Sequence, residues 1–234
     1  MTGDRAEADT TSATRAVHRI RDLIVRGNIA PGARLVEGEL ARRLHLSRSP
    51  TRSALQLLHQ EGFVRVHQSA NRVRIRVTPL TRSDASELYA VIGCLEGLAA
   101  RAVASLDEKQ RFPIAERMRG LNGRLADIPG DPLRHGDVFA LDRDFHRVIV
   151  EHGAGARLQA LHRSVEPQVE RYRRLYASSI VHQLHDSIEE HDEIVDALVA
   201  GDPERLEWAV QSNWKNGAGR LGSIIDELGE HGSW

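Results

Sequence analysis

The sequence predicts a mainly α-helical protein: an N-terminal winged helix-turn-helix of three helices and a β-hairpin wing, followed by an all-α bundle of six or seven helices. Apolar residues recur at helical spacing through most of the chain, one arginine-rich stretch alternates with a period of two, and glycine and proline divide the remainder into helix-sized segments. We expect a disordered N-terminus at 1–12, the winged domain at 13–78, a linker at 79–83 and the helical domain at 84–230.

Composition places the chain among ordinary globular proteins. Of its 234 residues, 41% are hydrophobic and 28% are charged. No apolar run approaches the ~20 residues of a membrane-spanning helix, and the polar N-terminus lacks the apolar core of a secretory signal. The single cysteine, Cys94, rules out an intrachain disulfide, as expected in a reducing cytoplasm. We therefore expect a cytoplasmic protein that does not bind membranes.

Charge is distributed unevenly along the chain. Thirteen arginines and four acidic residues lie between Thr11 and Leu80, a balance of +9, whereas the whole chain has a formal charge of −1. A basic block of this kind predicts a polyanionic partner, the alternative being a solvated basic surface. The block contains arginine and no lysine, and the guanidinium group suits bidentate contacts to phosphate and guanine.

The arginine-rich block begins with three predicted helices. The first covers 14–26 and stops at a Gly-Asn pair, the second covers 37–44, and the third begins at Ser49, an N-cap, with Pro50 at the first helical position. A tight turn over 45–48 joins the second and third helices. Together these two helices form a helix-turn-helix.

A β-hairpin wing is predicted directly after these helices. Residues 63–66 form its first strand and 67–71 its tip. In the second strand, three arginines alternate with three apolar residues, so the apolar side chains face the core and the arginines face the other way. The alternating residues are Arg72, Val73, Arg74, Ile75, Arg76 and Val77.

The stretch LIVRGNIAPGARLVEGELARRLHLSRSPTRSALQLLHQEGFV, from Leu23 to Val64, resembles the N-terminal domain of the GntR family of regulators. It contains that family's Pro-Gly turn, its E-x-x-L-A-x-x-L second helix and its S-R-x-P-x-R-x-A-L third helix. In the family the third helix enters the major groove, so the resemblance implies double-stranded DNA as a partner. The residues implied to contact DNA are Ser47, Arg48, Ser49, Thr51, Arg52 and, at the wing tip, Arg72.

Within this set, Arg48 and Arg52 are the expected readers of guanine O6 and N7, and the hydroxyl groups suit phosphates. Arg72 is expected to reach the minor groove. Two positions depart from the family pattern: Gly38 stands where members usually have arginine or lysine, and Val73 stands where they usually have glycine. These departures leave the operator sequence open.

The rest of the chain is expected to be helical throughout. Breaks rich in glycine, proline and serine separate the periodic segments, and no alternating stretch is long enough for a strand. The predicted helices lie near 84–106, 107–127, 136–152, 154–178, 180–200 and 203–228.

Four polar residues lie on otherwise apolar helical stripes of this domain. Asp142 and His146 stand one turn apart on one helix, His191 is at the centre of a second stripe, and Asn213 is at the centre of a third. Buried polar groups are costly unless paired, so either each is satisfied separately or all four converge in one cavity. A carboxylate with imidazoles forms a ligand set for zinc, nickel, manganese or iron(II).

The C-terminal part is similar to the ligand-sensing domain of the FadR subgroup. The marks are Leu-Glu-Gly-Leu-Ala-Ala at 95–100, Asp-x-x-Phe-His at 142–146 and Glu-His-x-x-Ile-x-x-Ala-x-x-x-Gly-Asp at 190–202. Many members of that subgroup bind a divalent metal through one aspartate and three histidines, and the metal helps to hold a small carboxylate effector. The residues that match three of these ligands are Asp142, His146 and His191.

The fourth ligand position falls at Asn213, where the subgroup has histidine. An amide oxygen is a weaker ligand for zinc, so either the affinity falls or the metal is a harder ion. A second departure is Ile92, because many members have an arginine there that points at the effector carboxylate. The histidines that could substitute for the fourth ligand are His162, His182 and His185.

One further helix contains candidate effector-binding residues. Arg171 and Tyr172, next to Arg173 and Arg174, either face the pocket and bind the effector or lie at the surface or in an interface.

Together these features predict a homodimeric transcriptional regulator, expected to be a repressor, that binds an inverted-repeat operator. A polar small-molecule effector, with or without a metal, is expected to control its affinity for DNA. Two alternatives stay open: a metal-dependent enzyme tethered to DNA, and a regulator whose metal-free pocket binds a polar ligand through Glu166, Glu170 and the pocket histidines. The sequence has no nucleophile motif, phosphate loop or nucleotide fingerprint, which disfavours the enzyme.

Overall fold

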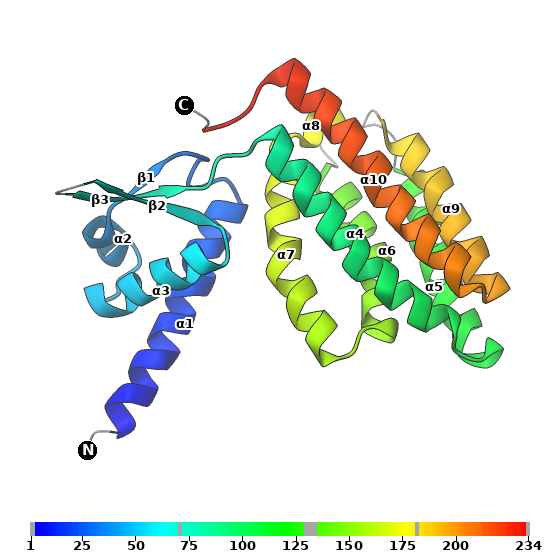
Figure 1. Ribbon diagram of the computed structural model, residues 1–234, viewed down its shortest axis with the longest axis horizontal. Coiled ribbons are helices and arrows are strands. Elements are labelled where there is room, and N and C mark those ends of the chain that lie inside the picture. Colours follow the sequence, from blue (N-terminus) through cyan, green and yellow to red (C-terminus); the bar gives the residue numbers. More distant parts are fainter. Residues whose placement is uncertain (1–2, 70–71, 129–134, 181–182, 233–234) are drawn as a thin grey trace. The chain divides into compact units, whose positions relative to one another are not determined.

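The computed structural model describes residues 3–69, 72–128, 135–180 and 183–232. The chain divides into two units, one formed by Met1–Thr81 with Glu230–Trp234 and the other by Arg82–Gly229 (Figure 1). The first contains helices and a small sheet, and the second contains helices alone within its described residues. This confirms the predicted fold class.

The first unit contains a winged helix-turn-helix. Its elements are α1 (Gly3–Val25), β1 (Arg34–Leu35), α2 (Glu37–Arg43), α3 (Arg48–Gln60), β2 (Val64–Ser69) and β3 (Arg72–Val77). Apolar residues at helical spacing on α1 and α3 pack together with the inner face of the sheet and form the core of the unit. Its most buried members include Ile20, Leu55, Leu58, Phe63, Val64 and Val77.

The wing is one strand larger than the predicted hairpin. Strands β2 and β3 pair antiparallel from Val64 opposite Val77 to Ser69 opposite Arg72. The short β1 pairs with the other edge of β3 and gives the order β1-β3-β2. Leu35 is the buried residue of β1, and two residues are too short a run to show a period in the sequence.

The starts of two helices in the first unit differ from expectation. Helix α1 begins at Gly3, so residues 3–12, expected to be disordered, continue the first helix. This segment has no proline, and no glycine interrupts the chain from Asp4 to Arg26, so nothing in it stops the helix. Helix α3 begins at Arg48 with an extended Ser47 as N-cap, and Pro50 still lies in the first turn, where no backbone N–H is needed.

The second unit is the predicted helical bundle. Its elements are α4 (Arg82–Ala104), α5 (Glu108–Ala126), α6 (His135–Gly153), α7 (Ala156–Leu175), the short α8 (Ala177–Ile180), α9 (Leu184–Ala200) and α10 (Pro203–Leu228). Helices α4 and α10 lie side by side along their length (Figure 1). They approach closely because α4 has glycine at the contact: a Cβ on Gly93 would lie 2.9 Å from Cβ of Trp214.

The end of the chain returns to the first unit. After Gly229, which has a φ of +90°, the backbone N–H and C=O of His231 pair with those of Leu80 at 3.0 and 2.9 Å. Gly232 packs against Gly32 so closely that a Cβ on Gly32 would lie 2.7 Å from the Cα of Gly232. The expected linker at 79–83 therefore contains an isolated antiparallel β-bridge at Leu80 and the first two residues of α4, and residues 230–232 belong to the first unit.

None of the helices in the described ranges combines the length and apolarity needed to cross a membrane.

Candidate functional site

The N-terminal end of α3 presents polar side chains to solvent. Ser47, Arg48, Ser49 and Arg52 are exposed there, as expected for residues that contact DNA. Thr51 is not: its side chain is fully buried, and its hydroxyl donates a hydrogen bond of 2.9 Å to the carbonyl of Ser47. The expectation that Thr51 contacts DNA is therefore wrong. Its position in the first turn points inward and supports the helix-turn-helix from within.

Arg52 is held by an acidic residue that the sequence did not single out. Its Nε and Nη2 donate to the two carboxylate oxygens of Glu37 on α2, at 2.9 and 3.0 Å. The pair raises the pKa of Arg52, and the Arg52 side chain stays 67% exposed. On the same surface, Arg48 lies beside Gly38, with Nη2 3.8 Å from where a Cβ would stand. Because Gly38 has no side chain, the guanidinium of Arg48 lies beside its backbone.

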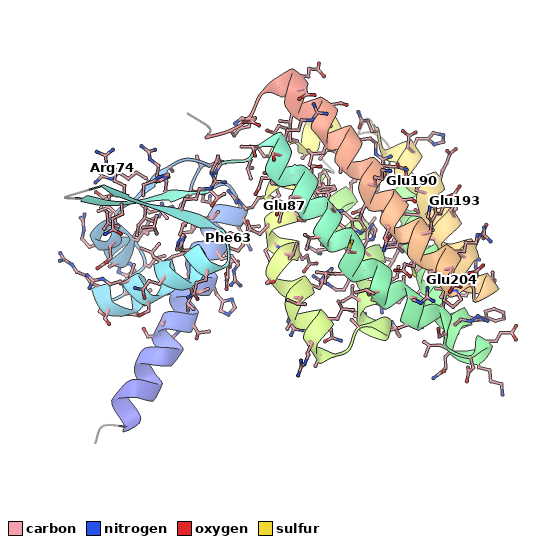
Figure 2. All side chains as sticks on the ribbon, viewed as in Figure 1. Phe63, Arg74, Glu87, Glu190, Glu193 and Glu204 are labelled. Atoms are coloured by element: carbon pink, nitrogen blue, oxygen red, sulfur yellow. The ribbon has the colours of Figure 1, made fainter. Side chains whose placement is uncertain are left out.

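The wing adds further arginines. Arg72 is the first residue of β3, and its side chain lies outside the described part of the structure. Arg74 is exposed and projects from the sheet (Figure 2). Arg76 instead donates a hydrogen bond of 2.8 Å to the carbonyl of Gly32, so it stabilises the wing.

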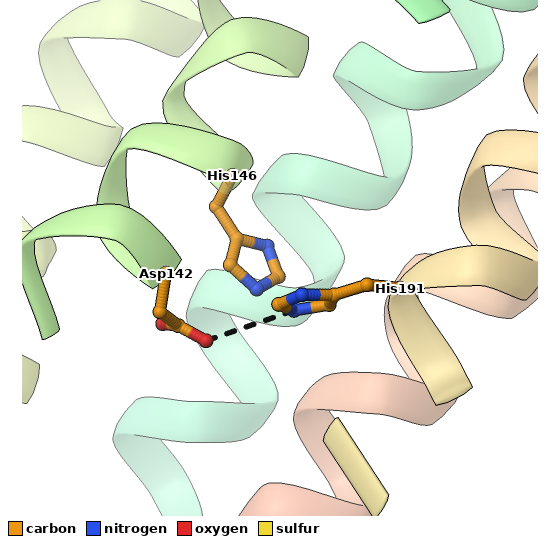
Figure 3. Close-up of side chains that lie close together, drawn as sticks. All are labelled: Asp142, His146 and His191. Atoms are coloured by element: carbon orange, nitrogen blue, oxygen red, sulfur yellow. Dashed lines mark ion pairs between the residues drawn. The ribbon is translucent and has the colours of Figure 1, made fainter. Parts of the chain in front are cut away.

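The helical unit brings three of the predicted metal ligands together (Figure 3). Helix α6 positions Asp142 and His146 one turn apart, and α9 positions His191 opposite them. One ligand atom from each of the three lies within 4.8 Å of the others, and Nε2 of His191 is 3.6 Å from Oδ1 of Asp142. The predicted convergence of these residues is thus present.

The protonation state and the hydrogen bonding of His191 suit a metal ligand. Its side chain is fully buried and stacks on the ring of Phe145, with 3.9 Å between ring centroids. Burial lowers the pKa of His191 to about 3, so the imidazole is neutral. Its Nε2 is buried and has no hydrogen-bond partner among the described residues. A buried nitrogen lone pair beside a carboxylate fits a divalent cation, which would use both.

His146 is oriented by a second buried carboxylate. Its Nδ1 lies 2.8 Å from Oε2 of Glu96 on α4. Glu96 also accepts hydrogen bonds from Nε2 of His162 at 2.8 Å and from Nε1 of Trp214 at 2.7 Å. Burial alone would raise the pKa of Glu96, but His146 and His162 lower it below the usual range. Glu96 therefore stays ionised and holds His146 in place, in the way that carboxylates orient metal-binding histidines.

Asn213, at the predicted fourth ligand position, differs from the other three residues in its contacts. Asn213 lines the same cavity from α10, but its Nδ2 donates to Oε2 of Glu190 at 2.7 Å, which leaves its Oδ1 as the atom that could meet a cation. The two candidate substitute histidines that the structure describes do not take the fourth position. His162 binds Glu96, and His185 is 81% exposed and pairs with Glu189, whereas His182 lies outside the described residues.

Arg173, which the sequence indicated only as a neighbour of the candidate effector residues, lines the cavity. Its Nη1 lies 2.6 Å from Oδ2 of Asp142, and its guanidinium stands 5.0 Å above the ring of Trp214. Although burial opposes charge on both partners, their attraction raises the pKa of Arg173 and lowers that of Asp142. A permanent cation thus already contacts one of the candidate metal ligands.

The two residues proposed to bind an effector do not line this cavity. Arg171 is 3% exposed and donates to Oε1 of Gln168 at 3.2 Å, and Tyr172 is fully buried with its hydroxyl 2.6 Å from Oδ2 of Asp84. That expectation is corrected, because the rotation of α7 turns Arg173 toward the cavity in place of its two predecessors.

The cavity has a volume of about 60 Å³, room for a cation with one or two small ligands. Its polar side is formed by both acidic and basic groups, and its apolar side by Phe139, Leu184 and Leu221. The polar and aromatic lining residues include Tyr89, Asp142, His146, Arg173, Asn213, Trp214 and Arg220.

Comparisons with known proteins agree with this architecture. Residues 12–72 match the family described as bacterial regulatory proteins, gntR family, and residues 87–215 match the FCD domain. A relative from Paenarthrobacter nicotinovorans, named "Probable D-xylose utilization operon transcriptional repressor", is 31% identical over 210 residues, which cover 88% of each chain.

Solved structures show the same fold. A transcriptional regulator of the GntR type from Rhodococcus sp. RHA1 is similar with a TM-score of 0.65 and 25% identity, over 90% of this chain and 97% of that one. McbR/YncC of E. coli has a TM-score of 0.64 at 18% identity, over 93% and 98% of the two chains, and is a likeness of fold alone. The relatives are named as regulators, which argues against the enzyme alternative. The chain belongs to the GntR family of bacterial transcriptional regulators, with a DNA-binding helix-turn-helix and a C-terminal FCD domain.

Proposed function

We propose that this regulator is a repressor of the FadR subgroup that binds an inverted-repeat operator as a homodimer and responds to a polar effector at a metal-assisted site. The observation that carries the proposal is the convergence of Asp142, His146 and His191 in one cavity of the FCD domain. An effector there changes the affinity for DNA only if it binds two arrangements of the protein unequally.

The cavity supports a cation and an anionic or polar ligand together. Asp142, His146 and His191 would hold zinc, nickel, manganese or iron(II), and Oδ1 of Asn213 would be a weaker fourth ligand. A bound metal supplies a Lewis-acidic centre for an oxygen of the effector. Arg173 and Arg220 also line the cavity and are ion-paired with Asp142 and Glu190. They would share these contacts with a carboxylate or a similar anion, and so take the part of the arginine that many members of the subgroup have at the position of Ile92.

A metal-free pocket is the second candidate, and a specific observation favours it. Arg173 is already 2.6 Å from Asp142, so a guanidinium supplies positive charge at a place where a metal would otherwise do so. Glu166 and Glu170, considered as polar ligands for such an effector, form ion pairs with Arg147 and Arg174.

An apolar stripe on α4 supports the homodimer. Val91 is 41% exposed and Leu98 is 55% exposed, and the exposed Cys94 lies between them. A two-fold axis through such a stripe would bury it against its own copy and would match two half-sites of an inverted repeat. We expect Leu98→Glu to shift the molar mass measured by light scattering from dimer toward monomer, with Lys109→Glu, at an exposed position of α5, as the control.

DNA binding with and without metal tests the proposal. Fluorescence anisotropy with a set of genomic fragments is expected to show binding of at least one fragment beyond non-specific competitor. Arg48→Ala should abolish it, and Arg157→Ala, an exposed arginine of the helical unit, should not. Elemental analysis of untagged protein distinguishes the metal-assisted site from the metal-free pocket. If no genomic fragment binds better than competitor, the proposal fails.

A further inference from the structure

We infer that Asn122 is a positioning residue that holds His191 in the tautomer whose Nε2 lone pair faces Asp142. The sequence did not single out Asn122, which lies on α5 and is 2% exposed. The inference rests on the proposed function only for the claim that a metal uses this lone pair.

The orientation of the Asn122 amide is set by its nitrogen. Nδ2 donates to the carbonyl of Ile188 at 3.0 Å and to Oδ1 of Asp192 at 2.7 Å, both on α9. A flipped amide would place its oxygen against these two oxygens, so the flip is disfavoured. The atom that remains for His191 is therefore Oδ1 of Asn122.

Oδ1 of Asn122 determines which ring nitrogen of His191 carries the hydrogen. Nδ1 of His191 is 3.1 Å from Oδ1 of Asn122. An amide oxygen only accepts hydrogen bonds, so Nδ1 must carry the hydrogen. In a neutral imidazole the other nitrogen, Nε2, then has a lone pair and no hydrogen.

The tautomer of His191 determines what its Nε2 presents to Asp142. Nε2 of His191 and Oδ1 of Asp142 are 3.6 Å apart, and both present lone pairs to the same buried space. A cation between these two acceptors would use both lone pairs, and metal–ligand bonds of about 2.0–2.2 Å from each are compatible with this separation. Without Oδ1 of Asn122, the imidazole would gain by moving its hydrogen to Nε2 and donating to Asp142. A hydrogen would then occupy the direction in which a metal binds.

A purely structural role for Asn122 makes a different prediction. Its two Nδ2 bonds tie α5 to α9 and would do so whichever tautomer His191 adopts. Asp192→Ala removes one of these ties and leaves the Oδ1 contact to His191, so it is the matched control for Asn122→Ala.

Long-range ¹H–¹⁵N correlation spectra of the metal-free full-length protein, labelled at histidine, report the tautomer directly. The His191 signals are assigned by their loss in His191→Gln. We expect Nδ1–H in the natural protein and in Asp192→Ala, and a shift toward Nε2–H in Asn122→Ala. Nε2–H in the natural protein would overturn the inference without any variant having to fold, and so would an unchanged tautomer in a folded Asn122→Ala.

Zinc titration by calorimetry supplies the second readout. Loss of the group that orients a metal-binding histidine typically weakens metal affinity about 10–100-fold, and we expect this for Asn122→Ala but not for Asp192→Ala. A natural protein that shows Nδ1–H and binds no zinc would contradict the metal-assisted site and leave the role of Asn122 standing. Equal zinc affinity of the natural protein and Asn122→Ala would contradict the role of Asn122.

Discussion

Arg173 reaches across from α7 to place its Nη1 2.6 Å from Oδ2 of Asp142, the carboxylate that also faces His191. A guanidinium and a divalent metal are both attracted to this carboxylate, and they repel each other in a buried site. The ion pair would therefore compete with a metal bound by the neighbouring histidines.

Replacing Arg173 tests this competition. We expect Arg173→Gln to bind zinc about 10-fold more tightly, a change of about 1.4 kcal/mol, because it removes the competing cation. Without metal the same variant should unfold at a lower temperature, since Asp142 loses its partner, and added zinc should restore the loss. Arg174→Gln is the control, because the Arg174 side chain is half exposed and pairs with Glu170. Zinc affinity that is unchanged or lower in Arg173→Gln would refute the competition.

Asn213 can be converted to the residue that the FadR subgroup has at its fourth ligand position. A third imidazole completes a tetrahedral set with Asp142, His146 and His191, so Asn213→His should raise both zinc affinity and the zinc content of purified protein. Asn216→His, one turn nearer the end of α10 and also bonded to Glu190, places a histidine at an exposed position and should change neither. If the two variants behave alike, the cavity does not direct residue 213 toward the metal.

Glu37 and Arg52 form an ion pair on the surface predicted to bind DNA, and replacing either partner is expected to have a different effect. Arg52→Ala should weaken operator binding by about 1–3 kcal/mol and relax specificity at one base pair. Glu37→Gln releases the guanidinium and removes a negative charge, so non-specific binding should strengthen. Anisotropy titrations over a range of salt concentrations separate the two effects, and Glu39→Gln is the control. Arg52→Ala with an unchanged ratio of specific to non-specific affinity would exclude Arg52 as a base reader.

The buried carboxylate of Glu96 is expected to stabilise the fold. Its carboxylate accepts from His162 and Trp214 and contacts His146, and Glu96→Ala would leave these buried groups unpaired. We expect a loss of about 3–5 kcal/mol in the free energy of unfolding, measured by urea denaturation. Glu87→Ala, on the same helix and exposed, should cost well under 1 kcal/mol, about the range of ordinary surface substitutions (Figure 2). Similar losses for both variants would mean that the Glu96 network contributes little.

The sequence predicted features that follow from periodicity and breaks. Regular apolar spacing indicated the helices, and two residues four apart on one helix must share a face, so Asp142 and His146 could be paired from the sequence. His191 followed from its place at the centre of an apolar stripe.

Other features depend on helix rotation or on partners distant in sequence. Thr51 lies among exposed polar neighbours, and only the first turn of α3 shows that it points inward. Arg171, Tyr172 and Arg173 are consecutive and differ by about 100° each around α7, so composition could not tell which one faces the cavity. The contact of Asn122 with His191 joins residues 69 positions apart, and no local pattern reports it.

The pairing of His231 with Leu80 has a consequence for how the protein is made. A fragment that ends at Thr81 lacks the segment that packs on Gly32, and so omits part of the unit that contains its helix-turn-helix. Domains generally fold as units while a chain is synthesised, with the N-terminal one first. Here the first unit acquires its last contacts only after the ribosome has passed through the whole FCD domain, so a polypeptide interrupted within that domain carries an incomplete DNA-binding unit.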